Sequence, residues 1–104
     1  MKLNALLLIG IFALLTSTGA AFAGGDASAG EAKAATCSGC HGADGMGNAD
    51  NPPIAGLETA YFVEQMAAFK SGARENAMMQ MFAGQLSDDD MADLAAYYST
   101  LNSN

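Results

Sequence analysis

The five residues Cys37-Ser38-Gly39-Cys40-His41 contain both cysteines and the single histidine of this chain. C-x-x-C-H is the sequence at which haem is covalently attached to proteins. On one helical turn Cys37, Cys40 and His41 stand at positions i, i+3 and i+4, so both sulfurs and the imidazole point to one side. Two thioethers could then hold a porphyrin while His41 ligates its iron from the same face. The motif therefore predicts one covalently bound haem c.

Two other interpretations of the motif are weaker. A thioredoxin-like redox pair would need a βαβ setting, which the sequence lacks, and the spacing could also arise by chance. A Cys37–Cys40 disulfide is conceivable in an oxidising compartment, but a bridge that closes so short a loop stabilises little. Haem suits the chain better, because it brings a large apolar disc to a small domain.

Residues 1–23 have the pattern of a secretory signal peptide. Lys2 gives a positive start, the segment from Ala5 to Leu15 is apolar, and Ala21-Phe22-Ala23 provides an A-x-A cleavage site. The apolar run is too short for a bilayer core, which needs about 20 residues. We expect cleavage after Ala23, which leaves residues 24–104 as one periplasmic domain without a membrane span.

The charge balance limits the class of partner. The whole chain has 4 basic and 11 acidic side chains, a net charge of −7. An acidic surface argues against nucleic acid as a partner, because the phosphates of nucleic acid are bound by basic groups.

The small size of the domain indicates that it needs additional stabilisation. The expected mature domain has 81 residues, and domains of roughly 70–80 residues commonly need a disulfide, a metal or another staple. A bound haem would meet that need.

Periodicity and capping residues predict an all-α domain. A first helix begins near Asp26, with small residues on one stripe, and the glycine-rich segment from Cys37 to Leu57 reads as loop. Thr59 can cap a second helix that ends at Gly72. The apolar stripe of this second helix consists of Phe62, Met66 and Phe69.

Two more helices are expected in the C-terminal third. Residues 76–82 predict a short helix that ends at Gly84. Ser87 followed by Asp90 resembles a capping box, and acidic residues in the first turn complement the helix dipole. The apolar side of this last helix holds Met91, Leu94, Ala95, Tyr98 and Leu101.

The second axial ligand of the iron has to come from another residue type, because His41 is the only histidine. Met or Lys could serve, and a Met thioether raises the haem potential. Met66 and Met91 read as core residues, and Met46 is too close in sequence to His41 to cross to the opposite face. The remaining candidates are Met78, Met79 and Met81, which lie between the second and last helices.

The chain as a whole resembles the class I c-type cytochromes of the bacterial periplasm. The segments that carry the resemblance are CSGCHGADGMGN, PPIAGL, YFVEQMAAFKSGAR and MMQMFAGQLSDDDMADLAAYYSTL. It is similar to single-haem cytochromes, to each half of the dihaem periplasmic cytochromes, and to the cytochrome subunit of flavocytochrome c sulfide dehydrogenase. The resemblance implies three to five helices wrapped around one covalent haem, with crossed N- and C-terminal helices.

The resemblance also implies roles for single residues. The family's axial Met lies seven residues before the Leu of an L-S-D motif, which is Met79 here, with Met78 as the close alternative. A proline carbonyl accepts from the ligating His, and Pro53 matches that place, with Pro52 as its nearest rival. Gly30 and Tyr97 match the crossing of the terminal helices.

These features predict an electron carrier rather than an enzyme. The haem would cycle between Fe(II) and Fe(III) with His41 and Met79 as ligands, and redox proteins would be its partners. The carrier could diffuse freely or belong to a redox enzyme. The alternative is a haem protein with an open distal position, such as a peroxidase-like enzyme or a gas sensor. Lys70 and Arg74 could pair with haem propionates or could simply be solvated.

Overall fold

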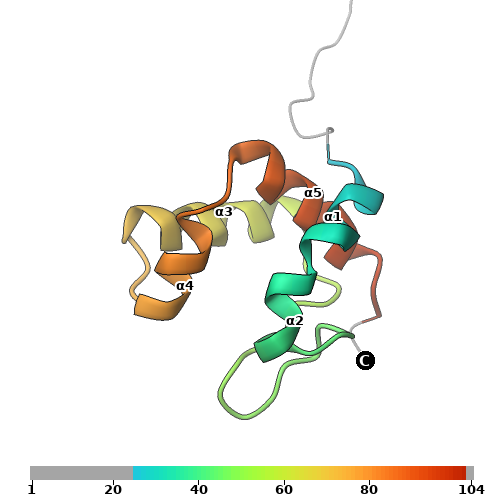
Figure 1. The fold of residues 1–104 in the computed structure, drawn as a ribbon, viewed down its shortest axis with the longest axis horizontal. Helices are drawn as coiled ribbons and strands as arrows, with labels where there is room; N and C mark the ends of the chain where they lie inside the picture. Colours follow the sequence, from blue (N-terminus) through green and yellow to red (C-terminus); the bar gives the residue numbers. More distant parts are fainter. Residues whose placement is uncertain (1–24, 103–104) are drawn as a thin grey trace, which may run out of the picture.

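The computed structural model describes residues 25–102, which form five α-helices and contain no β-strand. The helices are α1 (Ala27–Lys33), α2 (Ala35–His41), α3 (Thr59–Ser71), α4 (Ala77–Ala83) and α5 (Asp88–Ser99). A long loop joins α2 to α3 below the helices in Figure 1. The all-α prediction is confirmed. The expected signal peptide and its cleavage site lie outside the described residues.

The first predicted helix is in fact two helices, and the second of them contains the C-x-x-C-H motif. Asp26 caps α1, since its carboxylate accepts from the backbone N–H groups of Ser28 and Ala29. α1 and α2 meet at Ala34, which keeps helical dihedral angles and turns the chain without an extended break. The expectation of loop from Cys37 onward was wrong, because α2 continues to His41. Gly42, with a φ of 90°, ends it.

The terminal helices α1 and α5 cross, as predicted. Gly30 of α1 is buried, and a Cβ added there would run into the carbonyl group of Asp93 and the Cβ of Tyr97. The absence of a side chain at Gly30 therefore lets the two backbones approach. Figure 1 shows α1 beside α5.

A cluster of ion pairs stabilises the crossing of α1 and α5. The Lys33 Nζ donates to Asp93 Oδ2 at 2.6 Å and lies 2.9 Å from Asp90 Oδ1. This ammonium group lowers the pKa of Asp93. Hydrogen bonds from Ser87 and then from Lys33 lower the pKa of Asp90 to about 2. Both carboxylates therefore stay charged near neutral pH.

The apolar core lies between α3 and α5. Phe62, Met66 and Phe69 of α3 are buried against α5, which contributes Met91, Leu94, Ala95 and Tyr98. The core-filling role predicted for Met66 and Met91 is confirmed. This core is small, which agrees with the expectation that the domain needs a further apolar component for its stability.

The ends of α3, α4 and α5 follow the sequence signals with one exception. Glu58, not Thr59, is the N-cap of α3: its backbone is extended and its carboxylate accepts from the N–H of Tyr61, so Thr59 is the first helical residue. Gly72 and Gly84 follow the ends of α3 and α4 as predicted. Ser87 and Asp90 form the predicted capping box, which accounts for the acidic start of α5.

Gly30→Ala is expected to lower the free energy of unfolding by about 1–3 kcal/mol, the usual range for overpacking. The added methyl would meet the backbone of α5, which cannot yield as a flexible side chain can. Gly39→Ala is the matched control, because a Cβ at that helical position meets nothing within 4 Å. Chemical denaturation of both variants measures the difference. Equal stabilities would contradict the close crossing of α1 and α5.

Candidate haem site

Helix α2 carries the three residues of the motif in the predicted arrangement. Cys37, Cys40 and His41 occupy its last two turns, so their side chains leave one side of the helix. His41 is buried, with 8% of its surface exposed. Cys37 is partly buried against the core, Cys40 is exposed, and both are free thiols. Burial raises the pKa of the Cys37 thiol.

The orientation of His41 is set by a backbone carbonyl. Its Nδ1 lies 2.8 Å from the carbonyl oxygen of Pro52. A carbonyl can only accept, so Nδ1 carries the proton and donates. The other ring nitrogen, Nε2, therefore keeps its lone pair for a metal. A hydrogen bond of this kind orients a ligating imidazole and increases its basicity.

The acceptor is Pro52 and not Pro53, so the residue predicted from the family pattern was off by one. The carbonyl of Asn51 accepts from Asn48 N at 2.8 Å, and Ile54 N donates to the Gly45 carbonyl at 2.7 Å. These two bonds fix the loop segment from Asn51 to Ile54. The Pro52 carbonyl, which lies in this segment, is therefore directed to the imidazole. Sequence could not reveal this register, because it depends on contacts across the loop.

Asn48 organises this loop, a role that was not predicted from the sequence. Its Oδ1 accepts from the backbone N–H groups of Asp50 and Asn51 at 2.9 and 3.0 Å. Its Nδ2 donates to the carbonyl of Cys40 at 3.2 Å. Asn48 thus connects the loop to the end of α2. The Gly47-Asn48 pair, a frequent turn signal, could have indicated it.

The three candidate methionines of α4 differ in burial. Met79 is partly buried against the core, whereas Met78 and Met81 expose 58% and 53% of their surfaces. The Asn76 side chain caps α4 by accepting from Met79 N at 2.9 Å. In Figure 1, α4 lies apart from α2, with the loop that follows α2 below both. Met79 therefore comes from a different element than His41, as a second axial ligand must.

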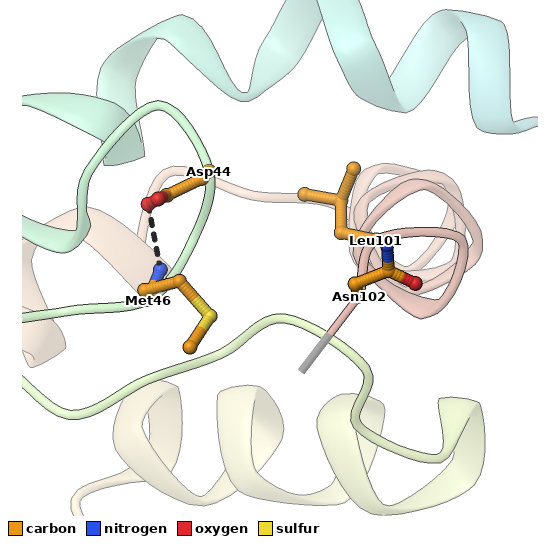
Figure 2. Close-up of a pocket in the computed structure, with 4 residues that line it drawn as sticks. All are labelled: Asp44, Met46, Leu101 and Asn102. Carbon is orange, nitrogen blue, oxygen red and sulfur yellow. Dashed lines mark hydrogen bonds between the residues drawn. The ribbon is translucent and has the colours of Figure 1, made fainter. Parts of the chain in front are cut away.

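Met46 lies next to the end of α5. It lines a pocket of about 350 Å³ together with Asp44, Leu101 and Asn102. Figure 2 shows these four residues around the opening, with the Met46 N–H donating to Asp44 Oδ1 at 3.0 Å. The residues that line this pocket include neither His41 nor any methionine of α4. This placement agrees with the view that Met46 is not an axial ligand.

Lys70 and Arg74 have partners of their own. The Lys70 Nζ donates to the carbonyl of Leu86 at 2.5 Å. The Arg74 guanidinium donates to Gln65 Oε1 at 2.7 Å and lies 4.5 Å from the centre of the Phe69 ring. These contacts are intramolecular and leave the proposed pairing with propionates as a prediction.

Two findings concern what residues 25–102 do not contain. Within this range, no group of three or more His, Cys, Asp or Glu side chains is placed to hold a metal ion. No helix in the same range has both the length and the hydropathy needed to cross a bilayer.

The family model described as Cytochrome c matches residues 27–102, almost all of the described part of the chain. The chain belongs to the cytochrome c family. Haem c is the cofactor that this family implies. The donor set fits it: α2 supplies two free thiols for thioethers and one imidazole whose Nε2 is available.

Relatives and solved structures agree with this assignment. Cytochrome c4 of Pseudomonas aeruginosa is 46% identical over 95 residues, which cover 90% of this chain and 47% of that protein. A thiosulfate dehydrogenase electron acceptor of Thiomonas intermedia is 48% identical over 71 residues, 66% of this chain and 33% of that protein. The structure of Acidithiobacillus ferrooxidans cytochrome c4 has a TM-score of 0.70 at 33% identity, covering 72% of this chain and 49% of that one. The chain thus spans about half the length of the cytochrome c4 relatives.

Proposed function

We propose that this domain transfers electrons through one covalent haem c and makes no bond in any substrate. The observation that carries the proposal is the arrangement of α2, where Cys37, Cys40 and His41 share one helix side and the Pro52 carbonyl holds Nδ1 of His41. The bound haem would supply the one-electron Fe(II)/Fe(III) couple. The chain's own residues attach, orient and enclose it.

Each of these residues has a separate task in the proposal. Cys37 and Cys40 would hold the cofactor as thioethers. His41 would bind the iron through Nε2, with the Pro52 carbonyl keeping the imidazole from rotating. Met79 would offer its thioether to the iron, which would raise the potential. Its partial burial supports it over Met78, and ligation retained in both oxidation states would keep reorganisation small.

The physiological setting follows from the same proposal. Residues 1–23 would direct the domain to the periplasm, where redox proteins would donate and accept its electrons. One relative is named as the electron acceptor of thiosulfate dehydrogenase, so a place beside an oxidoreductase is one form of this role. A freely diffusing carrier is the other. In either form the domain itself is not the catalyst.

An absorption spectrum of the purified protein tests the proposal against an open-site haem enzyme or sensor. We expect six-coordinate, low-spin haem in both the oxidised and the reduced state, because His41 and Met79 would both bind the iron. The ferrous protein should then bind CO slowly. Five-coordinate, high-spin haem that binds CO at once would contradict the carrier function and favour the open-site alternative.

Docking of a basic redox partner should depend on salt through acidic residues of the loop that joins α2 to α3. Asp44 and Asp50 are exposed in this loop, and exposed charges act over about 8 Å at physiological ionic strength. Asp44→Asn and Asp50→Asn should each reduce the salt dependence of the electron-transfer rate with a basic acceptor. Asp88→Asn and Asp89→Asn, at the start of α5, are the controls and should change it less. Equal salt slopes with a basic and an acidic acceptor would show that the acidic surface has no role.

A further inference from the structure

A ring of hydrogen bonds joins the end of α2 to the loop that follows it, through residues 40–41, 47–48 and 51–52. On one side of this ring, Nδ1 of His41 lies 2.8 Å from the carbonyl oxygen of Pro52. On the other side, the Cys40 carbonyl accepts from Asn48 Nδ2 at 3.2 Å, and the His41 carbonyl accepts from Gly47 N at 2.7 Å. The last carbonyls of a helix have no partner within the helix. Gly47 and Asn48 therefore supply donors to the end of α2.

The ring closes between Asn48 and the residues that precede Pro52. The Asn48 Oδ1 accepts from the backbone N–H groups of Asp50 and Asn51 at 2.9 and 3.0 Å. The Asn48 N–H donates to the Asn51 carbonyl at 2.8 Å. Gly47 lies against the same segment, because a Cβ added there would come within 2.6 Å of the Pro52 carbonyl carbon. A shift of the turn at Asn48 would therefore move the Pro52 carbonyl as well.

The side chain of Asn48 connects two parts of this ring that the backbone alone would leave less firmly joined. Gly47 and Pro52 contribute backbone groups only. The amide of Asn48, in contrast, directs its donor to α2 and its acceptor to the backbone just before Pro52. One side chain thus holds both the helix that carries His41 and the loop that carries the acceptor for its imidazole.

We propose that Asn48 is a positioning residue for His41, which acts through the Pro52 carbonyl and so tunes the reduction potential of the haem. This inference rests on the proposed function, since the potential concerned is that of a haem bound to His41. The hydrogen bond from Nδ1 increases the basicity of the imidazole, and a more basic ligand favours Fe(III). Loosening of the turn at Asn48 should weaken this bond and raise the potential.

Asn48→Ala tests the proposal, because it removes both the donor and the acceptor of the amide. Asn48 is exposed, so its replacement leaves no cavity in the core. In the reduced haem protein, ¹⁵N NMR measures how fast the Nδ1 hydrogen of His41 exchanges with solvent. We expect this rate to rise roughly 2- to 12-fold, the range that the net free energy of one hydrogen bond supports. Redox titration should show a higher potential than in the wild type.

Two further variants make the result specific. Serine at position 48 can still accept in the turn, though more weakly, but is too short to reach the Cys40 carbonyl. Asn48→Ser should therefore give an exchange rate and a potential between those of the wild type and Asn48→Ala. Asn51→Ala removes a side-chain bond to Asn48 Oδ1 at 3.2 Å but keeps the backbone bonds, and it should leave both values unchanged. A purely structural role would lower the free energy of unfolding without changing either value.

The proposal is overturned if Asn48→Ala retains the exchange rate or the potential of the wild type, or if Asn51→Ala changes them as much as Asn48→Ala. Failure of the proposed function would look different, because the wild-type protein itself would then contain no covalent haem.

Discussion

Met79→Ala is expected to lower the reduction potential of the haem on the order of 0.1 V or more, within the roughly 0.8 V range that axial ligands span. Loss of the thioether removes the ligand that stabilises Fe(II). The open position should admit CO and cyanide readily, and the weak sulfur-to-iron charge-transfer band of the oxidised protein should disappear. Redox titration and absorption spectroscopy measure these three changes.

Met78→Ala and Met81→Ala are the matched controls for this experiment. Both residues belong to α4 and both are exposed, so their removal should change potential and ligand binding little. A large change for Met78→Ala together with a small one for Met79→Ala would show that the ligand is one residue earlier. That outcome would leave the His/Met type of ligation intact but would contradict the assignment of Met79.

His41→Ala should largely abolish accumulation of haem-containing protein, because no other histidine exists to replace the ligand. Cys37→Ala and Cys40→Ala should each leave a single thioether and a less stable product. Ser38→Ala lies inside the same motif, where its hydroxyl bonds only the Ala35 carbonyl, and it should preserve full attachment. Haem-stained denaturing gels and whole-cell yields compare the four variants. Normal haem content in His41→Ala would contradict the proximal assignment.

Much of the fold could be predicted because its signals are local. Gly72, Ser87 and Asp90 act within one turn of the helix ends that they mark. The small-residue stripe with Gly30 indicated a close helix crossing, and the structure confirms it. The break at Ala34 could not be foreseen, since its dihedral angles remain helical and no glycine or proline marks the place.

The same difference between local and long-range contacts decides which parts of the site could be predicted. The arrangement of the C-x-x-C-H residues on one helix side could be predicted because the motif lies within one helix. Pro52 could not be separated from Pro53, because the choice depends on hydrogen bonds from Asn48 and Ile54 across the loop. The Met cluster was found from sequence, but the difference in burial between Met78 and Met79 arises only when α4 packs on the core.

The most direct test of the account is intact-mass spectrometry of the purified wild-type protein after acid-acetone extraction and alkylation. Acid would break the proposed bonds from His41 and Met79 to the iron, but it does not break thioethers. The account predicts a chain that retains the mass of one haem and contains no alkylated cysteine. Loss of all haem, with both Cys37 and Cys40 alkylated, would contradict it.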